Sequence, residues 1–297
     1  MSDFVGGASV ETGPLVTVAM PIYNAGAYLR LAVLSIVKQT EANWELLIID
    51  DGSTDNALDS IREIEDHRIR IFRDGANKGL AARLNEAIDL ARGKYFARMD
   101  QDDVSYPERF AMQLKELQDD NDLDLVATRA ILIDENNRAL GLFPCAISHE
   151  AICVHPWKGF YFPHPTWMGR IEWFRKYRYA EPAPYFCEDQ ELLLRSYKGS
   201  QFGTVPSVLL AYRIRSNTNW QKLAKTRHAV FAAQLRNFSD SNQWFFLLLA
   251  VVALIGKRIG DVARRIGGGS FLPGGNILID AEVIKWRSIL ETLSAEK

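Results

Sequence analysis

The first half of the chain alternates between two hydrophobic patterns that together predict repeated βαβ units. Short runs of aliphatic and β-branched residues are each followed by a longer segment with apolar residues at helical spacing. Strands are predicted at residues 15–20, 45–50, 70–72 and 94–99. Helices are predicted at residues 28–39, 80–91 and 107–117, with one of about ten residues after the turn at 51–55. The pattern indicates an α/β fold with a mostly parallel central sheet covered by helices on both faces.

The pattern becomes irregular after about residue 143. Six prolines lie among many aromatic residues between positions 144 and 184. Such a composition is typical of irregular loops and short strands that shape a pocket wall, so we expect the acceptor side of a binding site in this region. A helix is predicted at residues 189–196.

The C-terminal part is predicted to be helical, with a closing helix at residues 281–293. Residues 244–255 are apolar on every face, but a helix that spans a membrane needs about 20 such residues. Four basic residues interleaved with isoleucine and valine follow, namely Lys257, Arg258, Arg264 and Arg265. This pattern favours a helix that lies on an anionic membrane surface, with a core helix or a dimer contact as alternatives.

The patterns divide the 297 residues into three parts. Residues 1–13 form a flexible tail, residues 14–220 the main domain and residues 221–297 a helical appendage. Within the main domain, residues 14–143 form the βαβ half and residues 144–220 the proline-rich half. The sequence shows no internal repeat.

Composition narrows the class of protein. A formal net charge of −2 and a pI near 6.2 give no general reason to bind nucleic acid. The three cysteines are odd in number and lack C-x-x-C spacing, which indicates reduced thiols rather than a disulfide framework or a zinc site. Residues 1–13 have neither a basic start nor an apolar core, so no secretory signal is expected. We therefore expect a cytoplasmic protein.

Acidic residues follow two of the predicted strands. Asp50 and Asp51 end one strand, and Asp100, Asp102 and Asp103 follow another. Ligands of parallel sheets bind beyond the carboxyl ends of the strands, where both groups lie. Crowded carboxylates repel one another unless they hold a divalent cation or a polar ligand, and a helix cap would explain only one of them. The sequence thus predicts a metal-assisted site that handles phosphate.

Several short motifs, in their order and spacing, resemble those of the family 2 glycosyltransferases of the bacterial surface-polysaccharide type. The motifs are Pro21-Ile22-Tyr23-Asn24, Ile49 to Asp55, Asn77 to Leu80, Ala91 to Tyr95, Asp100 to Asp103 and Glu188-Asp189. The resemblance covers about residues 15–212. It implies the GT-A (Rossmann-like) fold and an inverting enzyme that transfers a sugar from a nucleotide diphosphate.

The resemblance also implies roles on the donor side. Asp102 matches the carboxylate that holds Mg²⁺ or Mn²⁺, and Asp100 lies nearer the nucleotide ribose. Asp51 accepts a ring N–H of the base, and Lys78 or Arg83 faces the diphosphate. The segment that cradles the base contributes Pro21, Tyr23 and Asn24. Arg215 stands where many relatives carry a histidine, and it is expected to pair with phosphate instead.

On the acceptor side, Asp189 matches the catalytic base, with Glu188 beside it to position the base or the acceptor. His164 matches an element near the acceptor. We expect a saccharide acceptor, lipid-linked, for surface polysaccharide or O-antigen, and a place at the inner face of the cytoplasmic membrane. The alternatives are a sugar-nucleotide nucleotidyltransferase, whose glycine-rich basic loop is missing at residues 21–28, and a non-catalytic carbohydrate-binding protein.

Overall fold

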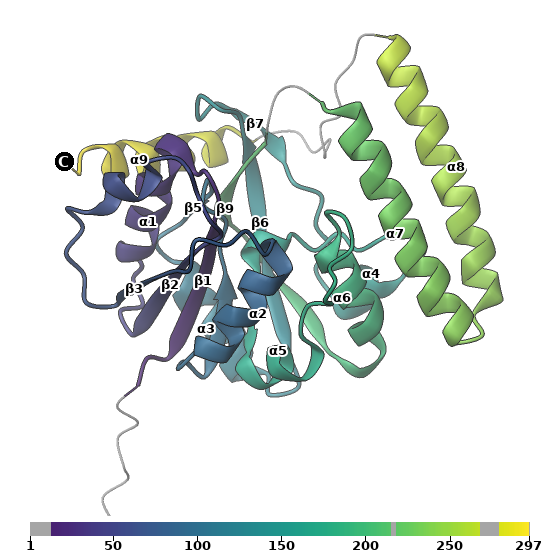
Figure 1. Ribbon diagram of the computed structural model, residues 1–297, viewed down its shortest axis with the longest axis horizontal. Coiled ribbons are helices and arrows are strands. Elements are labelled where there is room, and N and C mark those ends of the chain that lie inside the picture. The colour runs from purple at the N-terminus through teal and green to yellow at the C-terminus, as the bar shows by residue number, and fades with distance from the viewer. Residues whose placement is uncertain (1–12, 215–217, 268–278, 297) are drawn as a thin grey trace, which may run out of the picture.

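The computed structural model describes residues 13–214, 218–267 and 279–296, and Figure 1 shows its ribbon. The helices are α1 (Leu29–Val37), α2 (Leu80–Leu90), α3 (Arg109–Asp119), α4 (His149–Cys153), α5 (Ile171–Tyr177), α6 (Glu188–Ser196), α7 (Trp220–Asp240), α8 (Trp244–Ile266) and α9 (Asp280–Ser294). The strands are β1 (Val16–Ile22), β2 (Trp44–Asp50), β3 (Ile69–Arg73), β4 (Tyr95–Arg98), β5 (Val104–Ser105), β6 (Leu125–Ile133), β7 (Ala139–Leu142), β8 (Met168–Arg170) and β9 (Phe202–Arg213). The α/β fold class expected from the sequence is confirmed.

The strands of the described residues form one sheet in the order β3-β2-β1-β4-β8-β6-β9-β5, with β7 paired to β6. The first four strands are parallel, and β1 and β2 are buried along their whole length. Burial on both faces explains why their sequences are mostly apolar rather than alternating. In the other half, β8 runs antiparallel to both of its neighbours, and β6 and β9 are parallel to each other.

Two expected elements differ in the structure. The helix expected after the turn at residues 51–55 is only the short 3₁₀ helix Ala57–Ile61, because the chain soon returns to place Ile69 beside Leu46 in the sheet. The region after residue 143 contains α4 and α5 in addition to loops and short strands. Helix α5 buries Trp173 and Phe174, so aromatic residues there pack a helix onto the sheet.

Two clusters of buried apolar side chains cover the two faces of the sheet. Helices α1, α3 and α9 pack on one face, and α2, α5 and α6 pack on the other. Helices α7 and α8 form a hairpin beyond α6, and α9 returns to lie beside α1 (Figure 1). The buried Trp286 of α9 donates from its Nε1 to the carbonyl oxygen of Asn137, 2.9 Å away. The appendage expected at residues 221–297 therefore covers two separate places on the main domain.

The strands β1 and β4 separate at their carboxyl ends. The backbone N–H of Met99 donates to Ala19, and Pro21, two residues farther along β1, has no N–H to donate on that side. The chain order also reverses here, since β2 and β3 lie on one side of β1 and β4 on the other. Ligands of open α/β sheets bind at such a point, so the fold places a site between the ends of β1 and β4.

Candidate active site

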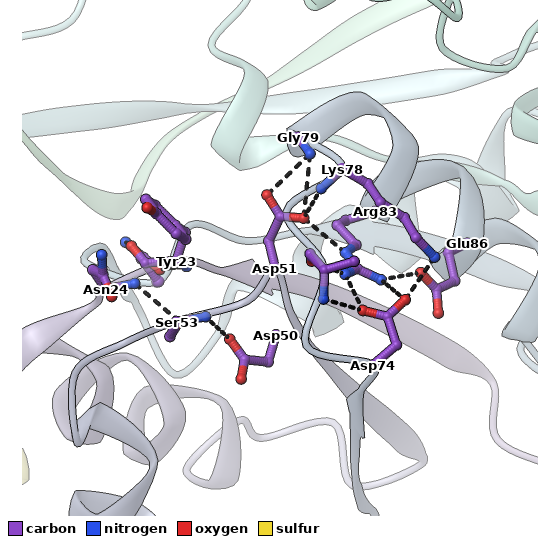
Figure 2. Close-up of polar contacts among 12 residues, drawn as sticks. Tyr23, Asn24, Asp50, Asp51, Ser53, Asp74, Lys78, Gly79, Arg83 and Glu86 are labelled. Carbon is purple, nitrogen blue, oxygen red and sulfur yellow. Dashed lines mark hydrogen bonds and ion pairs between the residues drawn. The ribbon is translucent and has the colours of Figure 1, made fainter.

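Asp51 organises the first part of the site, at the carboxyl end of β2. Its Oδ1 accepts from the backbone N–H of Lys78 at 2.7 Å, and its Oδ2 accepts from that of Gly79 at 3.0 Å (Figure 2). Arg83 of α2 also donates to Oδ1 from its Nε at 2.9 Å. The carboxylate thus fixes the loop before α2, and its Oδ2 accepts fewer bonds than its Oδ1.

Arg83 is buried and held by three carboxylates. Its guanidinium pairs with Asp51, with Asp74 at 2.6 Å and with Glu86 at 2.7 Å (Figure 2). These acidic partners raise the pKa of Arg83 above its ordinary range. Hydrogen bonds from Arg83 and Lys78 in turn hold the pKa of Asp74 far below its ordinary value. With three anionic partners, the buried guanidinium of Arg83 fixes the loop before α2. Of the two residues expected to contact the diphosphate, Lys78 is therefore the more accessible. The Lys78 side chain is half exposed and reaches Asp74 at 2.6 Å.

The loop after β1 combines an exposed ring with a tightly bonded backbone. The ring of Tyr23 is 48% exposed, which leaves its face open to a planar ligand. Asn24, at a φ of 49°, accepts at its Oδ1 from the backbone N–H of Thr54 at 2.8 Å. Asn24 therefore holds the turn after β2 in place. Gln101, which the sequence analysis did not single out, clamps the backbone of Tyr23 through both of its amide atoms.

Three aspartates follow β4, and each has a different environment. Asp100 pairs with the buried Arg98, whose Nη1 donates to its Oδ2 at 2.7 Å. Asp103 is fully buried and accepts at its Oδ1 from the backbone N–H of Arg213 at 2.8 Å. Arg213 also donates from its Nε to the carbonyl oxygen of Asp102. Arg213, the last residue of β9, therefore fixes the acidic loop of residues 100–103 through two hydrogen bonds.

The acidic loop carries unsatisfied negative charge. Burial and the neighbouring charge of Asp100 raise the pKa of Asp102 to about 6 and that of Asp103 well above its ordinary value. The Oδ2 of Asp103 is buried without a hydrogen-bond partner in the described part of the chain. A nearby cation would offset both penalties. The residues therefore fit a divalent ion at Asp102.

A complete protein-made metal cage is not found. Within residues 13–214, 218–267 and 279–296, no three His, Cys, Asp or Glu side chains are arranged to hold a metal ion. Mg²⁺ is commonly bound by only one or two carboxylates, with substrate phosphates and water as its other ligands. Asp102 suits that mode.

The second acidic group lies at the start of α6. Asp189 accepts at its Oδ2 from the Nε2 of Gln190 at 3.2 Å. Glu188 lies beside it, and burial together with the charge of Asp189 raises the pKa of Glu188 to about 7. Burial also raises the pKa of Asp189, which makes its carboxylate a stronger base than an exposed one.

His164 belongs to the same group of side chains. Its Nδ1 lies 3.8 Å from Oε1 of Glu188, and its Nε2 is 2.7 Å from the hydroxyl of Tyr179. Burial lowers the pKa of His164 well below its ordinary value, so the ring is neutral. The structure thus brings His164 to the adjacent pair Glu188-Asp189, which lies farther along the sequence.

Arg98 connects the two acidic groups electrostatically. It pairs with Asp100, and its charge also lowers the pKa of Glu188 and of Asp189. Its side chain is almost fully buried at the end of β4. A charged residue in an otherwise apolar strand is the sequence signal that identifies it. Arg98 therefore lies within electrostatic range of both carboxylate groups.

Replacing Arg98 with methionine is expected to move the pH dependence of the reaction. Removal of the positive charge raises the pKa of Asp189, and the acid limb of the kcat/KM profile shifts upward by about one pH unit. Arg98→Lys should restore most of the profile. Arg178→Met, which removes a surface guanidinium paired with Asp89, serves as the matched control. An unshifted acid limb in Arg98→Met contradicts this role.

Two predicted features lie outside the described residues. Arg215 is one, so its role at the phosphate stays a prediction. The flexible tail at residues 1–13 is the other, apart from Gly13.

Comparisons with known proteins show which family this chain resembles in sequence. The family model described as "Glycosyl transferase family 2" matches residues 17–178. An uncharacterized glycosyltransferase of Methanocaldococcus jannaschii is 31% identical over 213 residues, which cover 70% of this chain and 73% of that protein. The Escherichia coli protein WfgD, named UDP-Glc:alpha-D-GlcNAc-diphosphoundecaprenol beta-1,3-glucosyltransferase, is 35% identical over 129 residues, or 43% of this chain and 50% of WfgD.

The fold is also similar to a solved structure. TarS of S. aureus, residues 1–349 in complex with UDP, superimposes with a TM-score of 0.56 at 16% identity. The match covers 73% of this chain and 64% of the TarS chain. The matched part of the chain thus spans between half and three quarters of each of these three proteins.

Proposed function

Since the chain belongs to the family 2 glycosyltransferases, we propose that it transfers a sugar from a nucleotide diphosphate donor to a saccharide acceptor with inversion. The observation that carries the proposal is the pair of acidic groups, at Asp102 and at Asp189, that both interact electrostatically with the buried Arg98. One group suits the leaving diphosphate with its cation, and the other suits a proton acceptor.

The donor is proposed to bind across the ends of β1, β2 and β4. The exposed ring of Tyr23 stacks on the base, and the less occupied Oδ2 of Asp51 accepts from a ring N–H. Asp100 lies toward the ribose and Lys78 toward the diphosphate. Asp102 would hold Mg²⁺ or Mn²⁺, which supplies positive charge against the charge that develops on the leaving diphosphate.

The acceptor is proposed to react from the side of α6. Its hydroxyl oxygen forms the new bond to the anomeric carbon while the bond from that carbon to the diphosphate oxygen breaks on the opposite side. Asp189 takes the hydroxyl proton. Glu188 and His164 position the base and the acceptor, and the neutral ring of His164 leaves the negative charge of Asp189 unpaired.

A donor panel tests the proposed function. Incubation with UDP-, GDP- and dTDP-sugars and Mn²⁺ is expected to release nucleoside diphosphate from one donor, slowly in water and faster with an acceptor. Asp102→Asn should lose the release. Release of pyrophosphate from a nucleoside triphosphate and a sugar phosphate would instead identify a nucleotidyltransferase, and donor binding without any release would identify a carbohydrate-binding protein.

We further propose a lipid-linked acceptor and contact with an anionic membrane surface. WfgD is named for a diphosphoundecaprenol acceptor, and surface polysaccharide or O-antigen synthesis would use such carriers at the inner face of the cytoplasmic membrane. Among the described residues, no helix is long and apolar enough to cross a membrane. Helix α8 instead exposes an apolar face that includes Trp244, Phe245, Leu248, Val252, Ile255, Ile259, Val262 and Ile266.

The α8 face should bind vesicles that contain phosphatidylglycerol. The double variant Ile255→Ser/Ile259→Ser is expected to lower the partition coefficient at least about tenfold, because two large apolar side chains no longer enter the lipid. Added salt should weaken binding through Arg258 and Arg265. Leu235→Ser, an exposed apolar residue of α7, is the control. If the wild-type protein does not bind these vesicles in a flotation assay, the proposal that the α8 face contacts an anionic membrane is wrong.

A further inference from the structure

A cavity of about 280 Å³ lies between the α7–α8 hairpin and the loop of residues 157–161. Its wall is mostly apolar and includes Trp157, Phe160, Leu223, Phe231, Ala253 and Leu254. In Figure 1, α7 stands between α6 and the outermost helix, α8. The inner face of α8 thus lines the cavity, while its outer face is the exposed apolar face described above. A cavity of this size takes an apolar part of a ligand rather than a whole one.

The same cavity is positively charged. Lys158, Arg227 and Lys257 line it, and no carboxylate does among the described residues. Arg227 pairs with Asp261 at 2.7 Å, and Asp261 also accepts from Arg264 at 2.8 Å. Apolar walls that carry three basic side chains complement an amphiphile with an anionic head group.

Gln190 joins this cavity to the candidate base. Its side chain lines the cavity and donates from Nε2 to Oδ2 of Asp189 at 3.2 Å, while its Oε1 accepts from the backbone N–H of Phe160 at 2.8 Å. Gly159 has a φ of 102°, and a Cβ there would lie 2.8 Å from Oε1 of Gln190. The hydrogen bonds of Gln190 therefore connect the cavity wall at Phe160 directly to the carboxylate of Asp189.

We propose that this cavity binds the polyisoprenyl segment next to the phosphate of a lipid-linked acceptor, with the phosphate against Lys158, Arg227 and Lys257. The assignment rests on the proposed function, since it takes Asp189 as the base that receives the attached saccharide. The neighbouring Gln190 places the sugar end of such a molecule toward Asp189. Burial and the charge of Arg227 lower the pKa of Lys257, which a bound phosphate would relieve.

Calorimetry with farnesyl phosphate and the full chain tests the site. The wild-type protein is expected to bind it saturably, and inorganic phosphate should not compete. Ala253→Trp from α8 and Thr226→Phe from α7 fill the cavity from opposite sides, and each should weaken binding at least tenfold. Ala232→Trp, the same substitution at an exposed position of α7, should leave binding unchanged. Lys158→Gln should weaken binding of farnesyl phosphate but not of farnesol.

Two results would overturn the proposal. One is the absence of saturable binding to the wild-type protein, and the other is unchanged affinity in both cavity-filling variants that melt like the wild type. Hydrolysis of the donor needs no lipid, so it tests the proposed transferase activity independently of lipid binding in the cavity. Loss of binding with normal hydrolysis in Ala253→Trp supports the cavity site, whereas wild-type binding without any donor hydrolysis supports the cavity and contradicts the transferase.

Discussion

Replacing Asp189 with asparagine is expected to lower kcat by about 10³-fold and to leave donor affinity within twofold of the wild type. Asparagine keeps the size of the side chain and its contact with Gln190 but cannot accept the acceptor proton at neutral pH. General-base catalysis contributes about 10² to 10⁴ in rate, and the raised pKa of Asp189 places it toward the upper part of that range. Steady-state kinetics and calorimetry with the donor measure the two quantities.

Glu191→Gln is the matched control for this substitution. Glu191 also lies in the first turn of α6, but it pairs with Arg195 on the surface, so its loss should leave kcat unchanged. The wild-type rate should fall as the pH drops through the folded pKa of Asp189, because only the ionised carboxylate is a base. Equal losses in the two variants, or a fully active Asp189→Asn, would exclude Asp189 as the base.

Asp102→Asn should abolish transfer and at the same time stabilise the protein at pH 8. The loss of one ligand to the cation is expected to lower kcat by at least about 10²-fold, since the charge on the leaving diphosphate is no longer offset. The gain in stability follows from the pKa of Asp102, which is about 6 in the folded protein against an ordinary 3.8. The folded state then binds more protons than the unfolded state between these values.

Stability therefore falls as the pH rises from about 4 to about 6, and the loss is complete above that range. A shift of this size corresponds to about 1 to 3 kcal/mol in the free energy of unfolding at pH 8. Asp102→Asn removes the penalty, and thermal denaturation should show a higher Tm at pH 8 but not at pH 4. Mn²⁺ should raise the Tm of the wild type and not of the variant. Asp119→Asn, on the exposed surface of α3, should change neither. A lower Tm for Asp102→Asn at pH 8 would contradict this account.

The positions of the acidic groups could be predicted because they depend on local pattern. Asp51 and Asp102 follow strands that are mostly apolar, and parallel strands bring their carboxyl ends to one edge of the sheet. Asp189 begins a helix predicted at residues 189–196 and observed at Glu188–Ser196. Spacing along the chain therefore indicated both acidic groups.

The partners of these groups could not be predicted in the same way. Arg213 reaches the acidic loop from β9, more than a hundred residues away in the sequence, and Gln101 clamps Tyr23 across the gap between β1 and β4. Lys78 and Arg83 were equivalent in the sequence, but Arg83 is buried and pairs with three carboxylates, whereas Lys78 is half exposed and pairs with Asp74. Such contacts depend on the tertiary fold, which pattern alone does not specify.

The stereochemistry of donor hydrolysis shows whether the reaction is a direct displacement at the anomeric carbon. The donor identified in the panel, with its sugar linked α to the diphosphate, is incubated with the protein, and the first free sugar formed is observed by proton NMR before the anomers equilibrate. The β anomer is expected first, and its signal should be lost in Asp102→Asn and in Asp189→Asn. The α anomer first, or wild-type rates in both variants, would contradict direct displacement with Asp189 as the base.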